Sequence, residues 1–502
     1  MTDPQPTAPY FDALVAYGLR GASRFHVPGH KGGRSADPGL RYGIGDNALA
    51  LDIPQDIHGV DAGQSPTPYE RAETLAAEAH GAARTFFLTN GATQGNHALT
   101  LALAPQGAHV VVQRNSHASI VDGLVLSGGT PSFVAPEYDE DLGMALGVAA
   151  EALRTALAAG RVGDDIPRAA FVVSPTYYGI AADISALADV AHEAGVPLVV
   201  DQSWGPHFGF HPGVPESALR LGADAVLTST HKIAGSLTQS AMLHVADTGR
   251  VPIDAVARTL RLLRSTSPSS LLMGSLDAAR RQIAVHGEAM LHETIASVAT
   301  LHVKIRRTEG LDVLDADVRH MPGVGGWDPL RVVVDVRGIG RTGYEVADAL
   351  RERYDVNVEL ATHAVVVLLL GIGEDPVALQ RVGGDLDEIA SRLRRPGGGT
   401  TVPAPRAPDA VSVLPPRDAF LGPGETVDAD LAAAEGRISC ESIAGYPPGI
   451  PALLPGERVT PEIVTYLRRL VDAGARLHGA ADPALRTIRV LPAGYGERQG
   501  AS

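Results

Sequence analysis

The sequence predicts an α/β protein, in which a large domain with a mostly parallel sheet precedes a smaller α+β C-terminal domain. Short apolar runs alternate with helical patterns from about residue 84 to 245, which is typical of a parallel sheet covered by helices on both faces. A long helical pattern spans 275–310, and a Gly- and Pro-rich linker lies at 395–409. The predicted segments are an N-terminal arm with a basic loop (1–68), the large domain (69–325), the first part of a small domain (326–395), a linker (396–410) and a C-terminal domain (411–502).

Composition and charge exclude several classes of protein. An apolar content of 45% is ordinary for a globular chain and excludes global disorder. The formal net charge of −15 argues against nucleic acid as the main partner. The single cysteine, Cys440, cannot form an internal disulfide, residues 1–10 lack a signal-peptide pattern, and the apolar run 364–370 is too short to span a bilayer. We therefore expect a soluble, cytoplasmic protein.

The region before residue 84 predicts helices and one basic loop. A frayed tail and a short helix over 10–17 are expected first, and an amphipathic helix over 69–81 ends at a glycine cap. The loop between them contains His26 and His30. No carboxylate or third imidazole lies close by in the sequence, so the loop predicts no metal site.

A glycine-bearing turn follows the first predicted strand. The strand is Phe86–Asn90, the turn contains Gly91, Ala92 and Thr93, and a helix is expected over Asn96–Leu103. A turn that opens a helix offers free backbone N–H groups to a phosphate. The ordinary alternative is a helix cap without a ligand.

Two later strand ends carry reactive side chains. The buried run 197–200 delivers Asp201, a carboxylate that can pair with a pyridinium nitrogen. The run 225–227 leads to Lys232, whose amine can form a Schiff base with an aldehyde if burial desolvates it. Donors for a phosphate stand beside this lysine at Ser229, Thr230 and His231.

An aldehyde and a phosphate on one cofactor indicate pyridoxal 5'-phosphate (PLP). Taken singly, Lys232 could be a surface lysine in a turn and Asp201 an ordinary residue at a strand end. A phosphate cradle, a ring-nitrogen partner and a Schiff-base lysine occur here in the order found in fold-type I PLP enzymes. Together they predict a PLP site.

His117 is a further candidate for contact with the cofactor. It follows the predicted strand 110–112, at the carboxyl edge where open α/β sheets bind ligands, and its ring could stack on a pyridine ring. The alternative is a solvated loop histidine. The other strands and helices are expected at 146–159, 170–173, 184–194, 253–263 and 330–336.

A GxGxxG pattern at 338–343 resembles a dinucleotide-binding turn, with Glu359 as a formal partner for a ribose. It follows a long helix and has only one clear βαβ unit, so we interpret it as a structural turn. Near the C-terminus, a rigid proline turn is expected at 446–451 and a last helix at 461–475.

These stretches resemble the bacterial Orn/Lys/Arg decarboxylases, over about residues 25 to 470. The segment STHKIAGSLTQSA is similar to the family's lysine signature, although Leu227 stands just upstream where a small residue or Thr is usual. Other similar blocks, in the same order, are FHVPGHKGG, FFLTNGATQGN, HFGFHPG, LRSTSPSSLLMGSLDAAR and YPPGIPALLPGE. The resemblance implies PLP-dependent decarboxylation of arginine, lysine or ornithine, and at least a homodimer. It is closest to the short form, which lacks the family's N-terminal wing domain.

The resemblance also implies roles for individual residues. Lys232 would be the Schiff-base lysine, Asp201 the partner of the pyridinium nitrogen and His117 the residue stacked on the ring. The remaining cofactor contacts would come from Gly91, Ala92, Thr93, Trp204, Ser229 and His231. The substrate-binding set would be Glu441, near the distal cationic end, with Tyr178, His26 and His30. His231 and Tyr178 are the candidate donors of the Cα proton.

Some positions depart from the family pattern and keep other functions open. Gln55 and Gln202 stand where acidic residues are usual, and lost carboxylates would matter most for recognising a cationic side chain. The alternative enzyme is a PLP-dependent aminotransferase or lyase, although no arginine is an obvious partner for an α-carboxylate. A non-catalytic scaffold would predict a degraded lysine segment, whereas this one is intact. The sequence does not choose among the three basic amino acids.

Overall fold

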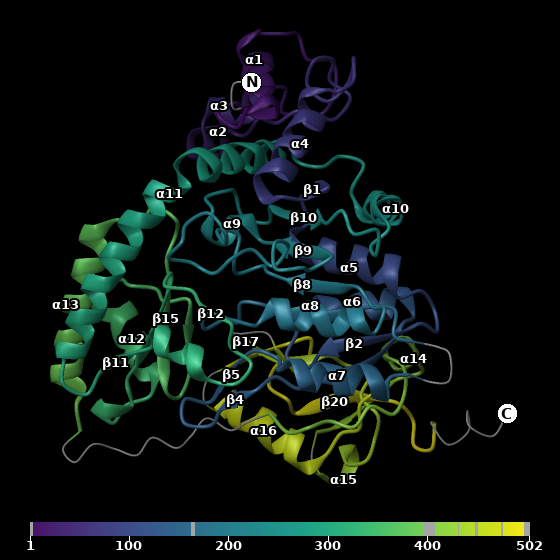
Figure 1. Cartoon of the computed structure of the whole chain (residues 1–502), viewed down its shortest axis with the longest axis vertical. Helices are drawn as coiled ribbons and strands as arrows, with labels where there is room; N and C mark the ends of the chain where they lie inside the picture. Colours follow the sequence, from purple (N-terminus) through teal and green to yellow (C-terminus); the bar gives the residue numbers. More distant parts are fainter. Residues whose placement is uncertain are drawn as a thin grey trace. The chain divides into compact units, whose positions relative to one another are not determined.

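Two units make up the fold, and each is assembled from segments that are far apart in the sequence. Unit 1 comprises residues 1–98, 199–296 and 370–374, and unit 2 comprises residues 99–198, 297–369 and 375–502. The computed structural model describes residues 4–161, 166–395, 407–429, 431–446, 450–472 and 475–495 (Figure 1). Two helices, α5 (Gly91–Leu103) and α11 (Ser270–Arg307), have residues in both units.

The strands of unit 1 lie in the order β1-β10-β9-β8 (Figure 1). Their bounds are Arg84–Leu88 for β1, Ala241–Val245 for β10, Ala225–Thr228 for β9 and Leu198–Asp201 for β8. β8 and β9 are parallel, whereas β10 is antiparallel to both β9 and β1. Strands β1, β9 and β8 therefore point the same way, so that their carboxyl ends meet at one edge. All residues of β8, β9 and β10 are buried, as expected for strands covered on both faces.

The helices of unit 1 agree with most of the sequence predictions. Those that lie wholly within the unit are α1 (Pro9–Leu19), α2 (Pro38–Ile44), α3 (Asp46–Leu51), α4 (Pro68–His80), α9 (Thr230–Ile233) and α10 (Ile253–Leu263). Thr67 and Glu70 form a capping box at the start of α4, and Gly81 ends it with φ of 70°. The predicted turn before α5 is wrong, because that helix already begins at Gly91.

A buried ion pair on α11 anchors the N-terminal segment of unit 1. Both Arg280 and Asp277 are fully buried, and the guanidinium donates to the carbonyls of Gln5 and Thr7 at 2.7 Å each. Asp277 accepts from the backbone N–H of Tyr10 at 2.9 Å. Removing one partner of such a pair leaves an uncompensated buried charge. Residues 5–10 are therefore fixed to α11, and the predicted frayed tail is wrong for them.

Two neighbouring histidines in the core of unit 1 are expected to make its stability depend on pH. The rings of His80 and His244 lie 4.2 Å apart, and burial lowers the pKa of His80 to about 4, with smaller contributions from Arg220 and Arg280. Because this value is below the ordinary 6.5, the unfolded state binds more protons in mild acid. The contribution of neutral His80 to the stability of the folded state is thus fully present above pH 6.5 and is lost as the pH falls toward 4. We expect protonation of His80 in the unfolded state to lower the free energy of unfolding by about 2 kcal/mol between pH 7 and pH 5.

Urea denaturation at these two pH values measures this loss. A His80→Phe variant can still pack against the neighbouring rings, and its free energy of unfolding should fall by about 2 kcal/mol less than that of the wild type on acidification. An equal loss in both proteins would exclude His80 as the titrating group.

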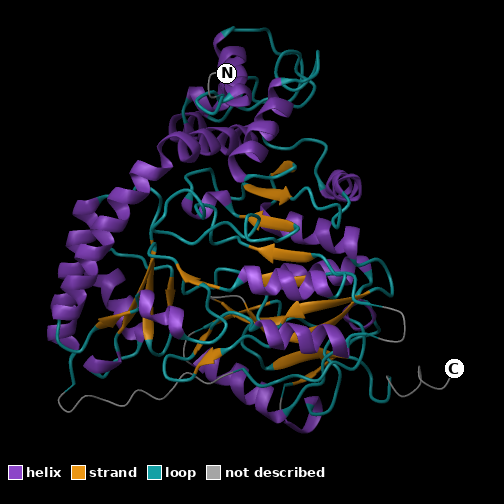
Figure 2. Ribbon diagram, viewed as in Figure 1, coloured by secondary structure: helices purple, strands orange, loops and turns teal. Residues whose placement is uncertain are grey.

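Unit 2 contains three parallel strands in the order β6-β2-β3. Their bounds are Ala170–Val173 for β6, His109–Gln113 for β2 and Thr130–Val134 for β3. The helices connected in sequence to these strands are α6 (Ala118–Ser127), α7 (Ala150–Ala159) and α8 (Ile184–Glu193). Helix α7 packs on α8 (Figure 2). Short antiparallel pairs add β4 (Tyr138–Asp139) to β5 (Met144–Ala145) and β7 (Ile180–Ala181) to β12 (Gly326–Trp327).

The GxGxxG segment belongs to a second, four-stranded sheet of unit 2. The strand order is β11 (Asp312–Val313), β13 (Arg331–Asp335), β15 (Val365–Leu369) and β14 (Leu360–Ala361), with two 3-10 turns (Ala316–His320 and Arg337–Ile339) and the helices α12 (Gly343–Tyr354) and α13 (Pro376–Leu393). β13 and β15 are antiparallel, whereas a dinucleotide site needs parallel strands. Gly343 lies against the chain, since a Cβ there would stand 2.1 Å from the Val365 carbonyl oxygen. This supports the interpretation of the segment as a structural turn.

The C-terminal part of unit 2 has its own buried core. Its elements are α14 (Pro416–Phe420), β16 (Glu425–Asp428), α15 (Leu431–Ala434), β17 (Ile443–Tyr446), β18 (Ile450–Leu453), α16 (Pro461–Asp472), β19 (Arg476–His478) and β20 (Thr487–Val490). Residues 396–406 of the predicted linker (396–410) and residues 447–449 of the predicted proline turn (446–451) lie outside the described residues. Among the helices that the structure describes, none is long and apolar enough to cross a membrane.

Candidate active site

Asp201 and Lys232 come from neighbouring parallel strands of unit 1. Asp201 is the last residue of β8 and is in register with Leu227 of β9. β9 ends one residue later, and Lys232 lies on the short helix α9 that follows it. The two side chains thus belong to the carboxyl ends of adjacent strands, the usual position of a ligand site in an α/β sheet.

Three donors hold the Asp201 carboxylate in one orientation. Oδ1 accepts from the backbone N–H of Ser203 at 3.0 Å and from its hydroxyl at 2.5 Å, while Oδ2 accepts from the Asn96 amide at 3.0 Å. Asp201 is only 6% exposed. Neither Asn96 nor Ser203 was among the predicted site residues. The position of Ser203, two residues after the aspartate, is a signal for such a turn, whereas Asn96 is distant in sequence.

Lys232 lies over an aromatic ring. Its Nζ is 3.4 Å from the centroid of the buried Trp204 ring, within the range of a cation–π interaction. Next to it, Nδ1 of His231 is 2.8 Å from the carbonyl oxygen of Ser240. This contact requires a proton on Nδ1 and leaves Nε2 as the acceptor in the neutral ring. Burial lowers the pKa of His231, although the Ser240 carbonyl opposes that shift.

The first turn of α5 provides backbone donors in unit 1. The N–H of Gly91 donates to the Gln239 carbonyl at 2.7 Å. The next two amides, of Ala92 and Thr93, have no intrahelical acceptor, as in the first turn of any α-helix. Near Lys232, the hydroxyl of Thr230 is buried and has no hydrogen-bond partner among the described residues. These groups suit a bound anion.

The other predicted residues of unit 1 lie on the N-terminal loop. His26 Nε2 is 2.8 Å from the hydroxyl of Tyr17, and His30 Nε2 is 3.0 Å from a carboxylate oxygen of Asp52. Each histidine therefore contacts its own partner within the arm.

Three predicted residues lie in unit 2. His117 is the N-cap of α6, and its Nδ1 accepts from the Ser119 N–H at 3.2 Å. The Glu441 carboxylate accepts from the backbone N–H groups of Ala481 at 2.7 Å and Arg489 at 2.9 Å. It is 6% exposed, and these two bonds connect the segment before β17 to β20 and to the segment after β19. Tyr178 lines a cavity.

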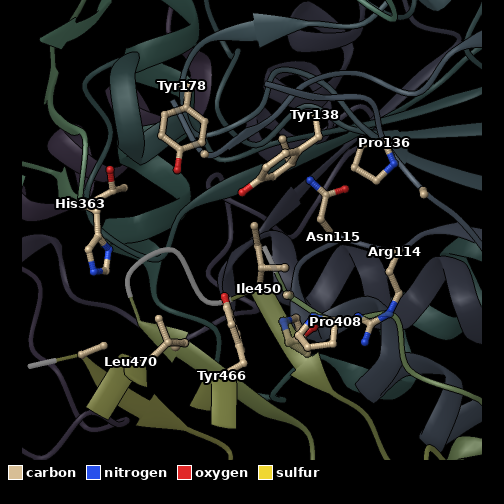
Figure 3. Close-up of a pocket in the computed structure, with 18 of the residues that line it drawn as sticks. Arg114, Asn115, Pro136, Tyr138, Tyr178, His363, Pro408, Ile450, Tyr466 and Leu470 are labelled. Atoms are coloured by element: carbon tan, nitrogen blue, oxygen red, sulfur yellow. Dashed lines mark hydrogen bonds between the residues drawn. The ribbon is translucent and has the colours of Figure 1, made fainter. Parts of the chain in front are cut away.

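This cavity of unit 2 has a volume of about 200 Å³ and tyrosines on several sides (Figure 3). The hydroxyl groups of Tyr138, Tyr178 and Tyr466 point into it, and His363 stands at its edge (Figure 3). Burial raises the pKa of Tyr178 above its usual range and that of Tyr466 to about 12, so both phenols stay protonated at neutral pH. Most of these positions carry no motif, because the cavity brings together residues from distant elements.

The fold is that of the fold-type I PLP enzymes. The structure of lysine decarboxylase A from Pseudomonas aeruginosa superposes with a TM-score of 0.80 at 21% identity, over 96% of this chain and 80% of that one. A structure of SPT with PLP has a TM-score of 0.53 at 17% identity, covering 76% of this chain and 85% of the other. The predicted fold class is thereby confirmed.

The chain belongs to the Orn/Lys/Arg decarboxylase family. The family's major-domain model matches residues 8–321, and its C-terminal-domain model matches residues 410–482. The arginine decarboxylases of Bacillus subtilis and Halalkalibacterium halodurans are 34% and 35% identical, each over 97% of this chain and 98% of their own length. Lysine decarboxylase LdcA of Pseudomonas aeruginosa is 25% identical over 90% of this chain and 74% of its own. The predicted activity, decarboxylation of a basic amino acid, is confirmed at this level.

Proposed function

We propose that this protein decarboxylates arginine, and that PLP is held at the carboxyl ends of β1, β8 and β9. The buried, oriented carboxylate of Asp201 beside the Lys232 helix is the observation that carries the cofactor site. The choice of arginine rests on the near full-length likeness to arginine decarboxylases, which exceeds the likeness to the lysine enzymes by about ten percentage points of identity.

The described residues of unit 1 fit PLP in charge and in donor pattern. Lys232 supplies the amine for the aldehyde, and Asp201 supplies an acceptor for the ring nitrogen. The first-turn amides of Ala92 and Thr93 and the unpartnered Thr230 hydroxyl supply donors for the phosphate. Ser229 and His231 belong to the same cofactor-binding set.

When bound, PLP supplies an electron sink for the pair of electrons left on Cα as the carboxylate departs as CO2. Asp201 would hold a proton at the ring nitrogen, and the hydrogen bonds from Ser203 and Asn96 keep its carboxylate in one orientation. In its neutral form His231 presents Nε2 as an acceptor, so it donates to Cα only after taking up a proton. Tyr178 is the alternative donor and stays protonated at neutral pH.

The remaining substrate and partner assignments are part of the same proposal. His117 would contact the cofactor ring, while Glu441, His26 and His30 would belong to the substrate-binding set. A cytoplasmic homodimer is the expected form. Strongly exposed apolar side chains on the N-terminal arm of unit 1 support the dimer, including Phe25 at 96% and Tyr42 at 94% exposure.

Incubation of the purified, PLP-loaded protein with each of L-arginine, L-lysine and L-ornithine tests the substrate. We expect CO2 and the corresponding amine from arginine. Its kcat/KM should be at least about tenfold above the values for lysine and ornithine, because a carboxylate can accept two parallel hydrogen bonds from a guanidinium. D-Arginine is the control for a stereospecific site. A preference for lysine or ornithine would contradict the proposal, and so would a keto acid as the product.

A further inference from the structure

The loop that carries His117 is attached to the C-terminal domain by a side chain that precedes it. Arg114 follows β2 directly and stands three residues before His117. Its Nη1 donates to the carbonyl of Pro451 at 2.7 Å, and its Nη2 donates to the carbonyl of Ala452 and to Oε2 of Glu457, both at 3.2 Å. All three acceptors lie more than 300 positions later in the chain.

Few conformations are open to the segment between Arg114 and His117. The N–H of Arg114 donates to the Val134 carbonyl at 2.9 Å, and that of Ser116 donates to the Gln113 carbonyl at 3.0 Å. The Gln113 amide donates in turn to Asn115 Oδ1 at 2.7 Å. These bonds, together with those of the guanidinium, hold the backbone that leads into His117.

The ring of His117 is fixed from the other side by α6. As the N-cap, it accepts at Nδ1 from the Ser119 N–H at 3.2 Å, and the Ser119 hydroxyl lies 2.8 Å from the same atom. The imidazole therefore moves with the start of the helix. Arg114 reaches the C-terminal domain through its hydrogen bonds. It lies among the residues that line the tyrosine cavity (Figure 3).

The pair formed by Arg114 and Glu457 is largely buried. The glutamate side chain is 1% exposed and the arginine side chain 19% exposed. Glu457 Oε2 also accepts from the Leu454 N–H at 2.7 Å, so it holds its own loop in place. Since an unpaired charge is costly at such a site, the arginine and the glutamate fix each other's position.

We propose that Arg114 is a positioning residue for His117, and that the C-terminal domain influences the reaction through the contacts between Arg114 and residues 451, 452 and 457. This inference rests on the proposed function, in which His117 lies against the cofactor ring. Glu457 anchors the arginine, and the two backbone carbonyls set its direction. The C-terminal domain is then part of the catalytic apparatus of the chain.

A second arginine contact supplies a matched control. Arg417 of α14 donates to the Leu126 carbonyl at 2.7 Å, near the opposite end of α6. It joins the same two parts of the chain but leaves the segment before His117 intact. An Arg417→Ala variant should therefore remove the bond to Leu126 and lower the stability of the protein, without altering the cofactor spectrum or kcat.

The experiment compares Arg114→Met, Arg114→Lys, His117→Ala and the double variant Arg114→Met/His117→Ala as PLP-loaded proteins. Arg114→Met should lower kcat about tenfold with little change in KM, and should alter the visible circular dichroism of the bound cofactor. Arg114→Lys, which keeps a charged donor, should recover much of this loss. In the His117→Ala background, Arg114→Met should cause no further fall in kcat.

Three outcomes would overturn the inference. They are multiplicative losses in the double variant, an equal effect of Arg417→Ala, and an unchanged spectrum in Arg114→Met. Thermal melts of each variant separate a loss of folding from a loss of positioning, and Arg114→Lys remains informative if Arg114→Met does not fold. A wild-type protein that decarboxylates arginine but fails these tests contradicts this inference alone, whereas one that neither binds PLP nor releases CO2 contradicts the proposed function as well.

Discussion

A Lys232→Ala variant is expected to release CO2 from arginine at least about 10⁴ times more slowly than the wild type, because the amine that reacts with the cofactor aldehyde is gone. The change should leave the fold intact. Helix α9 is held by its backbone, in which Lys232 N donates to the Ser229 carbonyl at 3.0 Å. The contact of the ammonium with the Trp204 ring is lost. CO2 release and the visible absorbance of the PLP-loaded protein measure the effect.

The small number of lysines makes the assignment direct. The chain has lysines only at positions 31, 232 and 304. Borohydride reduction of the PLP-loaded protein, followed by peptide mass spectrometry, should place a pyridoxyl group on Lys232. Lys304→Ala is the matched control, since that ammonium donates to the Gln380 carbonyl at 3.0 Å, and its activity should stay within about twofold of wild type. A pyridoxyl group on another lysine, or turnover by Lys232→Ala, would refute the assignment.

The parts of the fold that follow from local patterns agree with the sequence predictions. The helix α4 ends at Gly81 because glycine accepts the left-handed conformation, and α10 spans the predicted 253–263. The direction of β10 was not predictable in this way. An apolar run has the same pattern in a parallel and an antiparallel strand, and only pairing with β1 and β9 decides between them.

Contacts between residues distant in sequence limited the prediction of the site. Lys232 and Asp201 were found because each follows a buried strand, and the parallel pairing of β8 and β9 brings these two strand ends together. The Asn96 donor to Asp201 and the Glu457 partner of Arg114 lie 105 and 343 positions away. No local spacing signals such pairs. The substrate-binding role assigned to Glu441 stays a prediction. Its carboxylate also accepts two backbone hydrogen bonds, which is a structural role.

After the loss of Lys232, we expect the loss of the Asp201 charge to cause the largest fall in kcat. In an Asp201→Asn variant, Oδ1 can still accept from Ser203, while an NH2 group replaces the oxygen that faces Asn96. The Asn96 amide can turn to accept from it, so the site keeps its shape and loses its charge. We expect kcat to fall about 10²- to 10³-fold, because a neutral amide does not keep the ring nitrogen protonated. PLP affinity should change far less, since the phosphate donors are untouched.

Ser203→Ala separates charge from orientation. It keeps the carboxylate, the Asn96 bond and the backbone N–H of residue 203, and removes only the hydroxyl that lies 2.5 Å from Oδ1. Its kcat should fall by no more than about tenfold, the usual scale for one supporting hydrogen bond. If Asp201→Asn lost no more activity than Ser203→Ala, the carboxylate would be acting as a structural acceptor, and the proton at the ring nitrogen would need another source. A loss about ten times greater in Asp201→Asn would mean that the charge itself drives the reaction, with Ser203 and Asn96 serving to aim it.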